Sequence, residues 1–217
     1  MTDYAAQRRM MVDTQIRPAD VTKFPIIDAM LTVPRENFVP DAARETAYMD
    51  GLVRLGAGRA ILEPRTLAKM LDALDIQRNE LVLDLGCGLG YSSAVIARMA
   101  EAVVALEEDE AMAAEAEAAL AEADADNVAV VTGPLAAGAA KHGPYDAIIL
   151  QGAAEVMPEG LTDQMKDGGR IACVFMEGAL GVCRIGHKNA GAVDWRYAFN
   201  GAAPVLPGFA RAVEFQL

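Results

Sequence analysis

The chain has 217 residues, 53% of them hydrophobic, which is enough to bury the core of one compact domain. Its 31 acidic residues outnumber the 19 lysines and arginines, and the formal net charge of −12 makes nucleic acid and anionic membrane surfaces poor partners. The three cysteines and two histidines lack metal-ligand spacing, so we expect no metal. Without a signal peptide or about 18 consecutive apolar residues, the chain reads as cytoplasmic with reduced cysteines.

Residues 1–79 are expected to form a helical N-terminal extension. Pro34 ends one helical pattern, and Pro64 opens another in the first turn, where proline is tolerated. The expected helices cover 3–13, 20–32 and 64–74.

Residues 80–176 alternate short apolar runs with helical patterns, which is typical of a parallel sheet covered on both faces. This part is the predicted cofactor-binding core. Its expected strands are 79–85, 102–107, 127–131, 145–150 and 170–176, and its expected helices are 91–99, 109–123 and 160–166.

Residues 177–217 lose the helical pattern and predict antiparallel strands, formed by CRIGHK, VDWRYAF and ARAVEFQL. Trp195, Tyr197 and Phe199 alternate along one of them, which predicts that all three share a face, as core or as a subunit contact. The three parts together predict a single α/β domain over 1–217, as a monomer or homodimer.

A glycine turn, LDLGCGLGY (83–91), follows the first strand of the core, where open α/β sheets bind their ligands. Gly86, Gly88 and Gly90 alternate, whereas a dinucleotide fingerprint would place its third glycine where Tyr91 stands. Asp84 precedes the turn and suits a ligand with a positive amino group better than a pyrophosphate, which the carboxylate would repel.

Glu107 ends the second strand, where a carboxylate can accept hydrogen bonds from both ribose hydroxyls of a nucleoside. The alternative is that Glu107 merely begins the acidic first turn of the next helix. NAD sites share such a carboxylate, so the combination with Asp84 and the spacing of the glycines is what favours S-adenosyl-L-methionine over a nicotinamide dinucleotide.

At this point the chain resembles a class I methyltransferase, and more narrowly the protein-L-isoaspartate O-methyltransferase family. The segments that carry the narrower resemblance are RRMMVDTQI (8–16), DAMLTVPRENFVP (28–40), AYMDGLVRLGAGR (47–59) and PYDAIILQGAAEVMPEGLTDQMKDGGRI (144–171). The likeness covers about residues 5–176. It implies a Rossmann-like methyltransferase sheet with S-adenosyl-L-methionine as cofactor.

The resemblance implies a repair reaction in which the side-chain carboxylate of L-isoaspartate attacks the methyl group of the sulfonium. The protein then mainly positions the reactants and excludes water. The family carries a serine at the reaction centre, and AILEP (60–64) places Leu62 there, with Glu63 beside it. Arg59 and Arg65 are candidates to bind an anion. The acceptor-pocket candidates are therefore Arg59, Leu62, Glu63 and Gln151, the last just past the fourth strand.

A second departure concerns adenine. The family has a GDG segment after the third strand, whose acidic residue binds the adenine amino group. Here Gly133 is kept, while Pro134 and Leu135 replace the other two residues, so backbone groups and apolar contacts are left to hold adenine. The expected cofactor-binding residues are Asp84, Gly86, Gly88, Gly90, Glu107 and Gly133.

Three functions remain open from the sequence. The chain methylates a protein, peptide or small-molecule acceptor other than isoaspartate, or it keeps isoaspartyl repair with a reorganised pocket. Alternatively, it is a non-catalytic S-adenosylmethionine-binding or structural protein of the same fold. The loss of the family serine favours the first over the second, because leucine cannot hydrogen-bond an anionic nucleophile.

Overall fold

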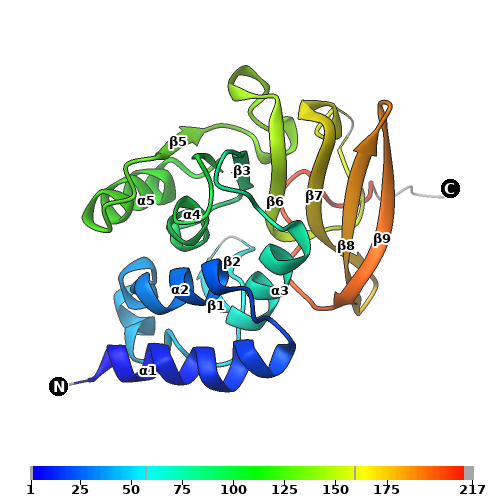
Figure 1. Cartoon of the computed structure of the whole chain (residues 1–217). Helices are drawn as coiled ribbons and strands as arrows, with labels where there is room; N and C mark the ends of the chain where they lie inside the picture. The colour runs from blue at the N-terminus through cyan, green and yellow to red at the C-terminus, as the bar shows by residue number, and fades with distance from the viewer. Residues whose placement is uncertain (1, 57, 159, 213–217) are drawn as a thin grey trace, which may run out of the picture.

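The computed structural model describes residues 2–56, 58–158 and 160–212. A seven-stranded sheet with the order β5-β4-β3-β6-β7-β8-β9 forms its centre (Figure 1). The strands are β3 (Leu81–Leu85), β4 (Ala102–Glu107), β5 (Val128–Thr132), β6 (Tyr145–Ala154), β7 (Met165–Glu177), β8 (Leu180–Asn189) and β9 (Ala192–Asn200). Strands β3 to β7 pair in parallel, and β8 and β9 add antiparallel pairings. The predicted α/β class and antiparallel C-terminal strands are confirmed.

The helices α4 (Tyr91–Ala97) and α5 (Glu110–Glu122) connect β3 to β4 and β4 to β5. Because parallel crossovers are right-handed and both connections step the same way, the two helices cover the same face of the sheet. Asp109 caps α5, with its carboxylate accepting hydrogen bonds from the backbone N–H groups of Ala111 and Met112. Ala116 and Leu120 point inward from α5 and join the core beneath it.

The opposite face carries short turns where the sequence predicted a helix over 160–166. Only a 3₁₀ turn, Thr162–Gln164, forms there, and β7 begins directly after it. Gly160, at the start of the expected helix, and Gly168, two residues after its end, both have positive φ, a conformation that is not helical. In addition, the Gln164 side chain bonds the backbone of the neighbouring loop, accepting from the Ala139 N–H at 2.9 Å and donating to the Ala137 carbonyl at 2.8 Å. These contacts replace the helix, because a seven-residue helix is a weak alternative.

The N-terminal extension contains α1 (Tyr4–Met11), which continues as a π-helical turn, Val12–Ile16, and then α2 (Phe24–Thr32) and α3 (Pro64–Leu74). Between the helices expected in this extension, β1 (Val53–Gly56) and β2 (Arg59–Ile61) form an antiparallel hairpin that the sequence analysis did not predict. Figure 1 shows α1 and α2 at the bottom, with the hairpin between them and the central sheet. The hairpin brings Leu55 to the turn at Gly88 and Arg59 to Glu107 at the end of β4.

A bulge in β9 overturns the prediction that its three alternating aromatics share one face. Arg184 pairs with Tyr197 but Cys183 pairs with Phe199, so Ala198 is an extra residue that shifts the alternation. Trp195 packs edge-on against Phe175 at 4.9 Å between ring centroids, while Phe199 belongs to the core on the other face.

The chain after β9 returns to the carboxyl end of β6. Ala153 N–H donates to the Pro204 carbonyl at 2.8 Å, and Leu206 N–H donates to the Ala153 carbonyl at 2.9 Å. Of the third C-terminal strand expected over 210–217, residues 210–212 are not a strand and 213–217 lie outside the described residues. This C-terminal segment covers the edge where the predicted site lies.

Gly152 lies in β6 where the C-terminal segment packs tightly against the strand. A Cβ atom added there would lie 2.4 Å from Leu206 Cδ2, 2.6 Å from Leu206 Cγ and 3.1 Å from the Pro204 carbonyl oxygen. We expect Gly152→Ala to lower the free energy of unfolding by about 1–3 kcal/mol, the usual cost of overpacking. Urea denaturation measures this, with Gly51→Ala as control because a Cβ there meets nothing within 4 Å. Equal stabilities of the two variants would contradict the close packing.

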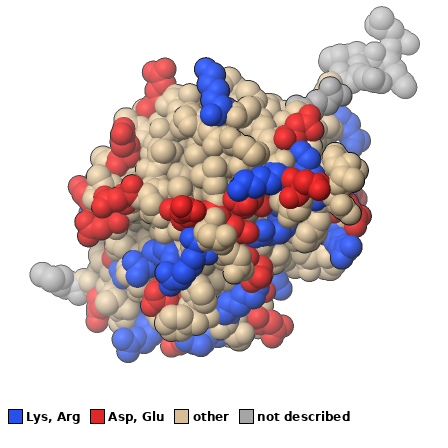
Figure 2. Space-filling model, turned by 45° about the horizontal axis from the view of Figure 1, so that its top comes forward, with Lys and Arg blue, Asp and Glu red and all other residues tan. Residues whose placement is uncertain are grey.

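Charged side chains of both signs are interspersed over the face shown in Figure 2. No helix in the described part of the chain combines the length and the apolar character needed to cross a membrane. The three cysteines, Cys87, Cys173 and Cys183, are buried free thiols.

Candidate functional site

Most of the predicted cofactor residues and the acceptor candidate Gln151 lie at the carboxyl edge of β3, β4 and β6. The chain steps from β3 to β4 and β5 on one side and later returns to β6 on the other side of β3, so the strand order reverses at β3. Such a switch point is where open α/β sheets bind ligands. Asp84 and the glycine turn come from β3, Glu107 ends β4 and Gln151 lies in β6.

The glycine turn has the conformation that its spacing predicts. Gly86, Gly88 and Gly90 have φ of 81°, 57° and 91°, values that L side chains rarely adopt. Gly86 N–H donates to the Leu106 carbonyl at 2.8 Å, which ties the turn to the end of β4. Gly90 is the N-cap of α4, so the helix N-terminus opens at this edge.

Asp84 is fully buried and bonds three side chains of the protein. Its Oδ2 accepts from Ser92 Oγ and Ser93 Oγ, each at 2.6 Å, and its Oδ1 accepts from Gln151 Nε2 at 2.7 Å. Burial raises the pKa of this carboxyl above its ordinary value, while the three hydrogen bonds oppose the rise. Asp84 therefore joins β3, α4 and β6, and its role towards an amino group stays a prediction. The sequence analysis missed both serines, although YSSA places them in the first turn after the glycines.

The raised pKa of Asp84 has a consequence for stability. The folded protein binds the Asp84 proton more tightly than the unfolded chain, whose aspartates titrate near about pH 3.9. The stability that Asp84 contributes is therefore highest below that pH and falls as the pH rises through the folded-state pKa.

We expect Asp84→Asn to remove the loss of stability that accompanies deprotonation of Asp84 as the pH rises. Relative to wild type, the variant gains stability as the pH rises from about 4. Urea denaturation across this range measures the difference, with the exposed Asp126→Asn as control. A difference that does not change with pH would contradict the raised pKa.

Glu107 is fully buried at the end of β4 and is surrounded by donors. Backbone N–H groups of Gly88, Glu108 and Asp109 donate to its carboxylate at 2.8, 3.0 and 3.3 Å. Arg59 adds a two-pronged ion pair, with Nη1 2.8 Å from Oε1 and Nη2 2.9 Å from Oε2. The carboxylate is thus in the position predicted for a ribose ligand, but a guanidinium of the same chain is bonded to it.

Arg59 also crosses the glycine turn. Its Nη2 donates to the Gly86 carbonyl at 2.5 Å, and its side chain is only 3% exposed. The anion that Arg59 binds in this structure is Glu107, so a role of Arg59 towards an acceptor stays a prediction. Sequence reasoning missed the pair because the two residues are 48 positions apart.

Two leucines complete the packing over the turn. Leu55 Cδ1 would lie 2.7 Å from a Cβ on Gly88, and Leu206 Cδ2 would lie 3.5 Å from a Cβ on Gly86. The chemical groups of this edge fit S-adenosylmethionine: a carboxylate for the ribose, backbone groups of the turn and a second carboxylate at its start. In this structure Arg59 and these two leucines lie against the glycine turn.

The acceptor candidates other than Arg59 have different surroundings. Leu62 is 1% exposed and belongs to the hydrophobic core, and its carbonyl accepts a 2.9 Å hydrogen bond from the fully buried Arg35. Glu63 is half-buried at the start of α3, where it accepts from Thr66 Oγ1 at 2.6 Å. Gln151 bonds Asp84, as described above. Their roles towards an acceptor stay predictions.

The predicted adenine side is formed by the loop after β5. Gly133 N–H donates to the Glu107 carbonyl at 3.0 Å, which keeps the loop beside β4. Pro134 is exposed, and Leu135 N–H donates to Glu108 Oε2 at 3.2 Å. Glu108 thus brings a carboxylate to the loop that has Pro134 in place of the family's acid.

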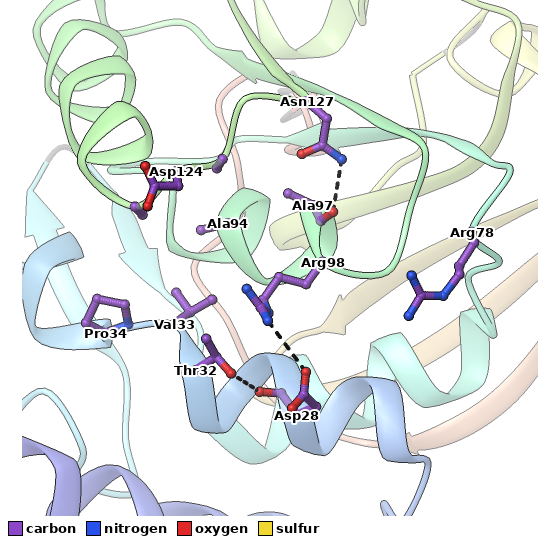
Figure 3. Close-up of a pocket in the computed structure, with 12 residues that line it drawn as sticks. Asp28, Thr32, Val33, Pro34, Arg78, Ala94, Ala97, Arg98, Asp124 and Asn127 are labelled. Carbon is purple, nitrogen blue, oxygen red and sulfur yellow. Dashed lines mark hydrogen bonds and ion pairs between the residues drawn. The ribbon is translucent and has the colours of Figure 1, made fainter.

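A hollow of about 320 Å³ elsewhere contains none of the predicted residues. It lies between α2, α4 and the residues before β5 (Figure 3). Arg98 faces Asp28 across it at 3.6 Å, and Asn127 Nδ2 donates to the Ala97 carbonyl at 2.9 Å. Because Asn127 precedes β5 and Arg98 follows α4, the hollow is at the amino edge of the strands. Parallel sheets bind ligands at the opposite edge.

Comparison with known proteins gives consistent matches. The family model for protein-L-isoaspartate(D-aspartate) O-methyltransferase matches residues 6–196. A protein-L-isoaspartate O-methyltransferase of Methylorubrum extorquens is 39% identical over 169 residues, which are 78% of this chain and 74% of the relative. One from Koribacter versatilis is 32% identical over 191 residues, or 88% of this chain and 86% of the relative.

A solved structure shares the fold. The Plasmodium falciparum protein described as a member of this methyltransferase family, in complex with S-adenosyl-L-homocysteine, aligns with a TM-score of 0.80 at 20% identity. The alignment covers 95% of this chain and 99% of the other.

Proposed function

The chain belongs to the protein-L-isoaspartate(D-aspartate) O-methyltransferase family, and from this premise we propose that it methylates an acceptor other than the isoaspartyl carboxylate. The family uses S-adenosyl-L-methionine, as the sequence predicted. The observation that carries the cofactor assignment is the meeting of the glycine turn, Asp84 and Glu107 at the switch point of the sheet. The observation behind the changed acceptor is the buried, apolar Leu62 at the position of the family serine.

The roles of the protein's own groups follow from their placement. When bound, S-adenosylmethionine supplies a methyl group activated by its sulfonium. Glu107 would hold the ribose, the glycine turn would allow close approach of the backbone, and Asp84 would face the amino-acid part of the cofactor. The C-terminal segment, which bonds β6 through Ala153, covers the edge and excludes water. The protein thus acts by positioning the two reactants.

A second candidate is a non-catalytic member of the family. The observation that favours it is the packing of Arg59, Leu55 and Leu206 over the glycine turn, with Glu107 fully buried beneath them. Such a protein would keep the fold of the family without catalysing methyl transfer.

Two measurements on the purified chain test these functions. Isothermal titration with S-adenosylhomocysteine is expected to show binding, and methyl transfer to an isoaspartyl peptide is expected to be weak or absent. Methyl transfer is then measured with reduced and unmodified test proteins and with small carboxylic acids, in order to identify the acceptor. Strong turnover of the isoaspartyl peptide would overturn the changed acceptor, and binding without any transfer would favour the non-catalytic candidate.

A further inference from the structure

We propose that Arg59 is a built-in latch that competes with the cofactor for Glu107. The term Arg59 latch denotes the Arg59 guanidinium bonded to the Glu107 carboxylate and to the Gly86 carbonyl. It presupposes that S-adenosylmethionine binds at this edge, as proposed above. The latch regulates that site, because the cofactor binds only after the guanidinium has left the carboxylate.

The hydrogen bonds at Glu107 show why the two occupants exclude each other. A carboxylate offers about four lone-pair positions to donors. Five N–H groups already point at this one, three from the backbone and two from Arg59. The three backbone donors belong to the turn and to the start of α5, so they are fixed parts of the fold. Arg59 is held by a side chain and can move away, and two ribose hydroxyls would then replace its two N–H groups.

The charge balance points the same way. Glu107 and Arg59 are both buried, and Asp84 lies close enough for the charge of Glu107 to affect its pKa. The guanidinium therefore balances the charge of Glu107 at a site that also contains the buried carboxyl group of Asp84. A sulfonium nucleoside brings its own positive charge, so it is chemically suited to replace the guanidinium.

The latch is also incompletely bonded. Arg59 Nε is buried and has no hydrogen-bond partner among the described residues. A buried donor without a partner is costly, which reduces the free energy needed to open the pair. Arg59 is the first residue of β2 in a hairpin of three paired positions, Val53 with Ile61, Arg54 with Ala60 and Gly56 with Arg59. By itself, a two-stranded hairpin of this length is marginally stable at best.

Arg59→Gln tests the latch by binding alone. The shorter, neutral side chain cannot form the two-pronged ion pair, so a larger fraction of molecules is open to the ligand. We expect S-adenosylhomocysteine, measured by isothermal titration, to bind the variant about tenfold or more tightly than wild type. The matched control is Arg54→Gln, which removes an exposed arginine from the same hairpin and is expected to leave the affinity unchanged.

The outcomes separate the latch from the proposed function. If wild type binds and Arg59→Gln binds equally or more weakly, the latch is overturned while the cofactor assignment stands. If neither binds at millimolar S-adenosylhomocysteine although both are folded, the cofactor assignment falls and the latch with it. Should Arg59→Gln not fold, Arg59→Lys keeps the charge but loses the fork, and we expect it to bind about threefold more tightly than wild type. Unchanged or weaker binding by a folded Arg59→Lys would also overturn the latch.

Discussion

Glu107→Ala is expected to lower the free energy of unfolding by about 3–5 kcal/mol, because it leaves a buried guanidinium without its counter-charge. Arg59 is 4% exposed and Glu107 is fully buried, so solvent screens their interaction little. The substitution also leaves three backbone N–H groups, those of Gly88, Glu108 and Asp109, without their acceptor. The effect is a large fraction of the roughly 5–15 kcal/mol that stabilises a typical domain.

Urea denaturation measures this loss, with Glu115→Ala on the exposed face of α5 as control, expected within about 0.5 kcal/mol of wild type. A second substitution isolates the ion pair. Adding Arg59→Leu to Glu107→Ala removes the uncompensated charge, so the double variant is expected to regain part of the lost stability. A loss below about 1 kcal/mol in Glu107→Ala, as for a surface pair, would contradict the buried ion pair.

Leu62→Ala is expected to cost about 2–5 kcal/mol, the range for deleting a fully buried leucine. Leu62 is 1% exposed and packs in the core that also contains Leu67 and Leu71 of α3. A residue lining an open acceptor pocket would lose much less on truncation, because part of its surface would already be in contact with water. The experiment therefore measures how far the position of the family serine has become part of the core.

The control for Leu62→Ala is Leu180→Ala at the start of β8, where the side chain belongs to a residue that is 52% exposed. It is expected to change the free energy of unfolding by about 0.5 kcal/mol or less. Similar small losses in both variants would show that Leu62 is not packed as the structure has it. Thermal unfolding followed by circular dichroism provides an independent measurement.

Glu107 and Leu62, the residues changed in these two experiments, both bear on the proposed methyl transfer. In the proposed latch, the Arg59–Glu107 pair closes the cofactor edge of the free protein. In the proposed function, the buried Leu62 leaves the acceptor side without the hydroxyl of the family. The first property concerns affinity for the cofactor, whereas the second concerns the choice of acceptor. They can therefore be tested separately, by binding of S-adenosylhomocysteine and by methyl transfer.

Sequence alone was sufficient for the parallel core. The strand expected over 102–107 is found as β4, and the helix expected over 64–74 is found as α3. Both carry strong local signals, a continuous buried run and an amphipathic pattern opened by proline. Asp84, the three glycines and Glu107 lie at one edge of the sheet, because the carboxyl ends of neighbouring parallel strands share that edge. Their role as the cofactor site stays a prediction.

Only the tertiary structure decided how that edge is filled. The β1–β2 hairpin carries a weak local signal of four and three residues, yet it places Arg59 on Glu107. The absent helix over 160–166 and the bulge in β9 likewise depend on partners distant in sequence, Ala139 for Gln164 and Cys183 for Phe199. The hydrophobic pattern of a segment predicts which of its residues are buried. It carries no information on which distant side chain occupies a given carboxylate, since that choice depends on the packing of the whole chain.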